Sequence, residues 1–267
     1  MNLSPLMIFP VLFPIVSGMA LMFFRPGTDE HRHRYETFVV LMNALLVFVS
    51  IARAGDGTLT LWRATETLAL SFRMDELSKT FAVLVSVIWP LVTFYAFGYL
   101  KRRPPEDRFF AFFLTTLGIL IGIAYAANFL TLYLFFELLT FMTLPLVMHS
   151  QRTEAISGGV KYLFYSLTGA GLALGGFFFF QACGVSTEFT PGGVMGAVTD
   201  PARRNTLLTV TFVTLIGFGA KAGLYPLHAW LPIAHPVAPT PAQNIVATAP
   251  TTPSITTPQN NPAPTGQ

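Results

Sequence analysis

Charge is scarce in this chain of 267 residues: Asp, Glu, Lys and Arg make up 11% of it, and hydrophobic residues make up 52%. A soluble domain carries about a quarter charged residues, so the composition excludes an ordinary soluble fold. Cysteine is scarcer still. Because Cys183 is the only one, an internal disulfide, a CxxC motif and a cysteine-ligated iron–sulfur cluster are excluded. Glycine-rich phosphate loops, Ser–His–Asp arrangements and haem signatures are also missing, and we expect no cofactor on this chain.

The apolar residues gather in runs of about twenty, the length that crosses about 30 Å of hydrocarbon as a helix. We therefore predict an all-α polytopic membrane protein with about seven transmembrane helices, the first of them retained because no basic segment precedes it. The predicted helices are Leu3–Phe24, Tyr35–Ala52, Leu77–Tyr99, Phe109–Ala127, Phe129–Met148, Val160–Ala182 and Thr206–Leu224. Between the second and third, alternation at 59–62 and 68–72 predicts a short hairpin on the membrane surface.

Basic residues in the short loops predict the orientation. Three of these loops fall on one side of the membrane, which the positive-inside rule makes cytoplasmic, so the N-terminus is expected outside. Their basic residues are Arg25, Arg32, Arg34, Lys101, Arg102, Arg103, Arg108 and Arg152. We expect a multi-pass protein of the inner (plasma) membrane whose surroundings are the lipid bilayer. Cations in such loops orient helices, so the net charge of +3 does not indicate a nucleic-acid partner.

The end of the chain has a different character. Pro236–Gln267 contains no charged residue, no aromatic residue and no hydrophobic periodicity, and it is rich in Pro, Thr, Asn and Gln. Such a segment buries too little apolar surface to offset the entropy of ordering, so we predict a disordered tail. The expected organisation is residues 1–108 with three helices and the surface hairpin, 109–235 with four helices, and the tail 236–267.

Two of the charges inside the predicted membrane helices stand out. Glu137 lies near the middle of the fifth, too deep for a short side chain to reach water. Lys221 lies near the end of the seventh, where nearby glycines and Pro226 predict a break of the kind that transporters place at ion sites. Buried ionisable groups commonly mark ion paths. The alternatives are a structural contact to a neighbouring helix for Glu137 and a lysine that snorkels to the interface for Lys221.

Three further residues carry weaker signals. Lys161 stands at the start of the sixth helix, where interfacial anchoring is the simpler interpretation. His228 and His235 follow the predicted break, and Pro232 interrupts any helix between them. They extend a proton path or contact lipid headgroups, and the sequence does not choose between these alternatives. Because a third ligand and a nearby acid are missing, no metal site is expected.

Four strings in order carry a family resemblance. The chain resembles the antiporter-like membrane subunits shared by respiratory complex I, Mrp-type sodium/proton antiporters and membrane-bound energy-converting hydrogenases. The strings are FRMDELSKTF (Phe72–Phe81), LYLFFELLTFMTLPLV (Leu132–Val147), GGVKYLFYSLTGAGLALGG (Gly158–Gly176) and GFGAKAGLYPLHAWLPIAHPVAPTP (Gly217–Pro241). The resemblance implies that Glu137 and Lys221 form an ion-pair switch, that Lys161 passes charge onward, and that His235 is the histidine after the break.

Two departures from the family pattern stand out. Ile233 occupies a position where the family often has an acid. Members usually have about fourteen helices arranged as two inverted five-helix repeats. The resemblance covers roughly residues 1–241 and includes only the first seven helices, so it predicts a product truncated before the second repeat or a split subunit completed by another chain.

The resemblance implies a subunit that translocates protons or sodium ions together with other membrane subunits of a redox-driven pump or antiporter. Whatever NADH:quinone oxidoreductase or hydrogenase chemistry such a complex performs belongs to its other subunits, because this chain offers no cofactor ligands. The alternative is a structural or assembly subunit that conducts nothing. A seven-helix receptor fits the number of helices but gives no reason for Glu137 and Lys221.

Overall fold

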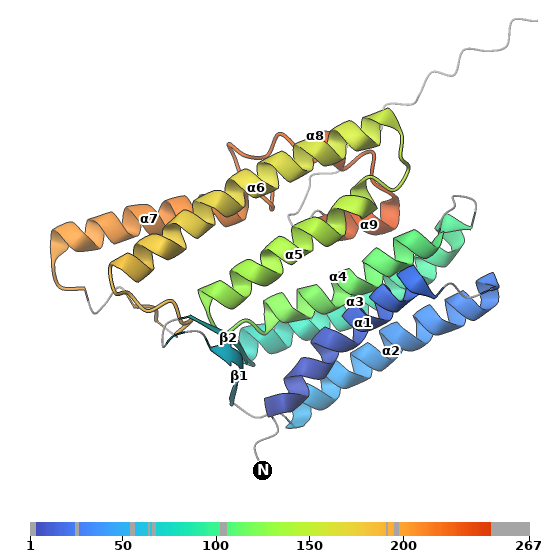
Figure 1. The fold of residues 1–267 in the computed structure, drawn as a ribbon, viewed down its shortest axis with the longest axis horizontal. Coiled ribbons are helices and arrows are strands. Elements are labelled where there is room, and N and C mark those ends of the chain that lie inside the picture. The colour runs from blue at the N-terminus through green and yellow to red at the C-terminus, as the bar shows by residue number, and fades with distance from the viewer. Residues whose placement is uncertain are drawn as a thin grey trace, which may run out of the picture.

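The computed structural model describes residues 4–24, 27–53, 57–63, 65, 68–101, 106–190, 192–194 and 198–246. It is a set of long helices that run side by side (Figure 1). They are a 3₁₀ helix Ser4–Ile8 leading into α1 (Phe9–Phe23), then α2 (Asp29–Arg53), α3 (Glu76–Leu100), α4 (Glu106–Ala124), α5 (Phe129–Val147), α6 (Thr153–Ala182), α7 (Pro201–Gly219), α8 (Leu231–Ala234) and α9 (Thr240–Val246). Among the described residues, six helical segments are long and apolar enough to cross a membrane: the 3₁₀ helix together with α1, and then α2 to α6. The predicted all-α polytopic membrane fold is confirmed, with α7 at the position of the seventh helix.

The helices form two groups joined by α5. The first is a bundle of α1 to α4, whose interior holds the largest cluster of buried apolar side chains, including Val11, Val47, Trp89 and Phe113. The second is the pair α6 and α7. Helix α5 lies between the two groups and contacts both α4 and α6 (Figure 1). A group on α5 can therefore interact with α6 and with the segment that follows α7.

The predicted hairpin is present as β1 (Thr58–Arg63) and β2 (Ala69–Arg73), which pair antiparallel with an irregularity between Thr60 and Trp62. It fixes the turn between α4 and α5. The side chain of Asn128 caps α5 by accepting a hydrogen bond from the N–H of Thr131 at 2.9 Å, and its Nδ2 donates to the carbonyl of Ala69 at 2.8 Å. The hairpin thus sets the position at which α5 begins.

Several helices begin earlier than predicted. Helix α2 begins at Asp29 and α4 at Glu106, so the cations Arg32, Arg34 and Arg108 lie in helices rather than in loops. Helix α6 begins at Thr153. The early turns are polar and carry acidic residues, which stabilise a helix N-terminus. A hydropathy pattern does not predict such turns, because their residues are polar.

The segment after Pro236 differs from the predicted disordered tail at its start. Helix α9 covers Thr240–Val246, and both Ala238 and Ala242 are buried. Gln243 Nε2 donates hydrogen bonds to the carbonyls of His235 at 3.1 Å and Ala238 at 3.0 Å. Small residues that pack against α5 order this part of the chain, although they give little hydrophobic periodicity. The rest of the predicted tail, 247–267, lies outside the described residues.

Candidate functional site

The seventh helix is broken immediately before Lys221, as the glycines and proline predict. Helix α7 ends at Gly219, and the N–H of Leu224 turns back to the carbonyl of Gly219 at 2.8 Å. Gly223 has φ of +73°, in the left-handed region that favours glycine. The fully buried indole of Trp230 donates to the carbonyl of Ala220 at 2.8 Å, which satisfies a backbone acceptor freed by the break.

Close packing of α6 against α7 brings the break next to α5. Gly169 on α6 and Gly217 on α7 face each other, and a Cβ on either would collide with the carbonyl oxygen of the other. The two backbones can approach this closely only because both positions are glycine. Lys221 follows directly and extends its side chain toward α5.

The ammonium of Lys221 is held by α5. The residue is 8% exposed, and its Nζ donates to the carbonyl of Phe136 at 2.9 Å and to Thr140 Oγ1 at 2.5 Å. Nζ also lies 4.3 Å from the centroid of the Phe136 ring, within the range of a cation–π interaction. The side chain therefore turns into the protein and does not snorkel.

Glu137 occupies the same turn of α5. It is half-buried, its Oε1 is fully buried, and this oxygen has no hydrogen-bond partner among the described residues. The carboxylate of Glu137 and the ammonium of Lys221 are close enough to interact electrostatically. In the described part of the chain, however, Lys221 forms no ion pair with Glu137, because its ammonium rests on Phe136 and Thr140. The structure thus brings the two residues together without direct contact.

Buried hydroxyls surround this pair, and no motif in the sequence predicted them. Thr143 Oγ1 and Tyr162 OH are 2.7 Å apart, and Tyr162 is 1% exposed. Ser166 lies one turn further along α6, where its buried hydroxyl is close to that of Tyr162. The available signal was spacing, because Thr140 follows Glu137 by three residues and Thr143 follows Thr140 by three, so each is a neighbour of the one before it on the surface of α5.

The other predicted site residues lie apart. Lys161 is exposed, whereas its neighbour Tyr162 faces the interior. His228 is also exposed, and its ring centroid is 5.6 Å from that of Tyr225. His235 is half-buried, and its carbonyl accepts the bond from Gln243. Within the described ranges, these side chains form no hydrogen bond or ion pair with Glu137 or Lys221.

The part of the chain that the structure describes contains no group of three His, Cys, Asp or Glu residues arranged to hold a metal ion. The charges that the fold assembles around Lys221 are an ammonium and a carboxylate, and the remaining polar groups are hydroxyls and a backbone carbonyl. Such a set can hold and move a proton, or bind a small cation through oxygen ligands.

Comparison with known proteins adds family matches over two regions. Residues 126–256 match the family described as NADH:quinone oxidoreductase/Mrp antiporter, TM. Residues 62–110 match the family described as NADH-Ubiquinone oxidoreductase (complex I), chain 5 N-terminus. The first match contains both Glu137 and Lys221.

Among curated relatives, the Na(+)/H(+) antiporter subunit A1 of Staphylococcus haemolyticus is 27% identical over 206 residues, which is 76% of this chain and 25% of the relative. The NAD(P)H-quinone oxidoreductase chain 5 of Picosynechococcus sp. is 26% identical over 257 residues, which is 91% of this chain and 38% of the relative. The chain thus spans well under half the length of these relatives.

Among solved structures, a chain of the membrane-bound sulfane sulfur reductase, an archaeal respiratory membrane complex, superposes with a TM-score of 0.73. The sequences are 16% identical, and the match covers 89% of this chain and 49% of that chain. This likeness shows a shared fold, which agrees with the two family matches. The chain therefore belongs to the antiporter-like membrane subunit family that complex I and Mrp antiporters share.

Proposed function

We propose that this chain forms an ion half-channel of a proton- or sodium-translocating membrane subunit, in which Lys221 bears the translocated proton and Glu137 controls it. The observation that carries the proposal is the buried ammonium of Lys221 on neutral acceptors of α5, one turn from a carboxylate whose Oε1 is unpartnered. A buried ammonium is costly in hydrocarbon unless polar groups stabilise it.

The geometry supports a switch with two arrangements. In the arrangement described above, Lys221 is bound by Phe136 and Thr140, and its charge is separated from Glu137. In the other, the lysine side chain swings to Glu137 and the opposite charges stabilise each other, an attraction that the apolar surroundings strengthen. Movement of the ammonium away from the carboxylate favours release of its proton. Lys161 would then accept charge on the exposed side of α6, and His228 and His235 would lie along the segment after the break.

The remaining machinery belongs to other chains. The relatives named above are subunits of larger assemblies, and we propose that this chain likewise works beside other membrane subunits, which supply any redox chemistry. In this proposal the transported ion is a proton or a sodium ion, and the C-terminal end of α7 faces the cytoplasm.

The test is ion flux in membrane vesicles that carry the complete complex with Lys221→Ala or Glu137→Gln. A matched control is Lys79→Ala, because that lysine forms a surface ion pair with Glu76 at 2.7 Å. We expect the first two variants to lose flux while the control keeps it, and separate proton and sodium gradients identify the ion. A complex that assembles and conducts normally with Lys221→Ala would overturn the proposal and favour a structural or assembly subunit.

A further inference from the structure

A second group of charges lies in the α1–α4 bundle, at the end of α2 that adjoins α4. Its centre is Arg32, whose side chain is 8% exposed. One guanidinium here faces four carboxylates, so the group carries an excess of negative charge. The acids around Arg32 are Asp29 at 3.0 Å, Asp107 at 2.9 Å, Glu36 at 3.9 Å and Glu106 in direct contact.

Glu36 is the innermost of these acids. It is 0% exposed, and among the described residues neither carboxylate oxygen has a hydrogen-bond partner. Asn43 follows seven residues later on the same side of α2, about 10 Å further into the bundle. It is also 0% exposed, and both polar atoms of its amide lack a partner in the described structure. Two fully buried polar side chains thus follow one another along a single helix.

Helix α3 presents matching groups at the same depth. The ring of His33 stacks on that of Phe97 at 4.2 Å, which fixes the level of α2 against α3. The two helices are antiparallel. Asn43 lies ten residues after His33 on α2, so along the helix axes it is level with residue 87 of α3, which lies ten residues before Phe97. That level lies between Ser86 and Trp89. Ser86 Oγ and Trp89 Nε1 are buried and have no hydrogen-bond partner among the described residues.

Unpartnered polar atoms inside a bundle are costly, because they lose the hydrogen bonds that water gives them in the unfolded chain. Native proteins normally satisfy such atoms with buried water, which makes two to four hydrogen bonds in a polar site. Glu36, Asn43, Ser86 and Trp89 together provide the donors and acceptors that a short file of water needs. Beyond them, on the next turn of each helix, Val47 and Ala82 are fully buried and apolar. The polar stretch therefore has a defined inner end.

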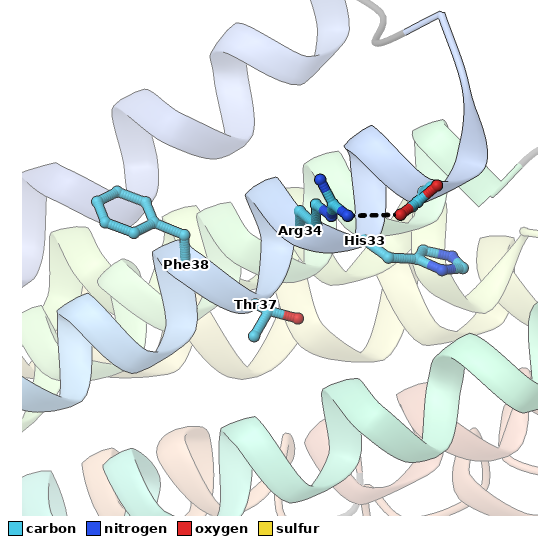
Figure 2. A pocket seen from close by; sticks show the side chains of 5 residues that line it. His33, Arg34, Thr37 and Phe38 are labelled. Atoms are coloured by element: carbon cyan, nitrogen blue, oxygen red, sulfur yellow. Dashed lines mark hydrogen bonds and ion pairs between the residues drawn. The ribbon is translucent and has the colours of Figure 1, made fainter.

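An open pocket lies beside the first turns of α2 (Figure 2). The residues that line it are Glu30, His33, Arg34, Thr37 and Phe38. Arg34 pairs with Glu30 at 2.6 Å, so the cation at the rim is neutralised. His33 also faces inward, where its Nε2 is 3.4 Å from Glu106 Oε2. His33 thus both lines the pocket and contacts the acidic group.

We propose that a hydrated path enters the α2–α3 interface from this pocket and delivers a monovalent cation, a proton or a sodium ion, to Glu36. The path ends at Asn43, Ser86 and Trp89. The excess of carboxylates selects positive charge, and oxygen ligands suit both a hydrated proton and a sodium ion. This exchange site is separate from Lys221 and Glu137, and it stands whether or not those residues translocate an ion.

The charged groups that face Glu36 come from two helices. Arg32 lies on its own helix, and Glu106 and Asp107 lie on α4. At the same level α3 contributes a hydroxyl, that of Thr93, which already donates to the carbonyl of Trp89 at 2.8 Å. Arg32 anchors the acids, and its Nε lies 3.9 Å from Glu36 Oε1 without forming a hydrogen bond. Glu36 is therefore the member of the group that is placed to take up an exchangeable cation.

Cysteine accessibility tests the path in the full chain in its membrane. Cys183 is the only native cysteine, so a Cys183→Ser background gives a clean baseline. Asn43→Cys and Ser86→Cys are compared with Val47→Cys and Ala82→Cys, which lie one turn beyond the proposed end. We expect a small cationic thiol reagent to modify the first pair at least about tenfold faster, because a hydrated thiol ionises readily and a dry one does not. Equal rates in both pairs would overturn the path.

The second measurement keeps those four positions native and follows Glu36 by infrared difference spectroscopy, with Glu36→Gln to assign the carboxyl signal. A signal that responds to pH alone assigns the exchanged ion as a proton. A signal that responds to sodium at constant pH assigns sodium. A Glu36 signal that responds to neither would overturn cation exchange at this site, while flux through Lys221 would be unaffected by that result.

Discussion

Removal of the Thr140 hydroxyl should impair the Lys221 switch. Thr140 is fully buried, and its Oγ1 accepts a hydrogen bond from the Lys221 ammonium at 2.5 Å. Thr140→Val keeps the shape of the side chain and removes this acceptor. A hydrogen bond to a charged group contributes about 1.5–3 kcal/mol. Since about 1.4 kcal/mol corresponds to a tenfold change in an equilibrium, the balance between the two lysine arrangements should move by about ten- to a hundredfold.

The assay is the initial rate of ion flux in vesicles that carry the complete complex, with Thr140→Ser as the matched control. Serine retains the hydroxyl and loses a methyl group. We expect the valine variant to lose about tenfold or more of the rate and the serine variant to stay close to the parent. Parental flux in Thr140→Val would refute the reasoning, and so would equal losses in both variants, because packing would then explain the effect.

Other parts of the fold give further predictions for thermal unfolding in detergent. Arg32→Met leaves buried carboxylates uncompensated and should destabilise the bundle by about 3–5 kcal/mol, whereas Arg34→Met removes an exposed ion pair and should change stability by less than about 1 kcal/mol. Gly18→Val should cost about 1–3 kcal/mol or more, because a side chain at this position collides with the backbone of α4. Asp75 caps α3, and hydrogen bonding from the backbone N–H of Ser78 lowers its pKa; Asp75→Ala should cost about 1 kcal/mol at neutral pH. That stabilisation is fully present above about pH 4 and is lost as the pH falls further through the lowered pKa, so the two proteins should converge in acid.

The sequence predicts the parts of the fold that depend on apolar runs and on special backbone residues. The positions of the long helices follow from hydropathy, and the break after Gly219 follows from the glycines and proline around Lys221. The hairpin follows from alternation in two short segments. In each case a local pattern carries the information, because the surrounding bilayer requires helices whose backbone bonds are satisfied internally.

The remaining features depend on contacts between distant segments. The sequence predicts Arg32 to be a cation in a loop. Only the packing of α2 on α4 places it beside acids that are seventy-four or more residues away in the sequence. The partnership of Lys221 with Thr140 joins residues 81 apart. Helix α9 is short and buries the small residue Ala242, so its order comes from packing rather than from periodicity. No local sequence pattern predicts any of these three features.

A double-mutant cycle of ion flux tests the central claim most directly. Glu137→Gln, Lys221→Met and the double variant are measured in the same complete complex, together with the parent. If the two residues act as one switch, each single variant should remove most of the flux and the double variant should lose little more, which gives a large coupling energy. Independent effects whose free energies simply add would contradict the account.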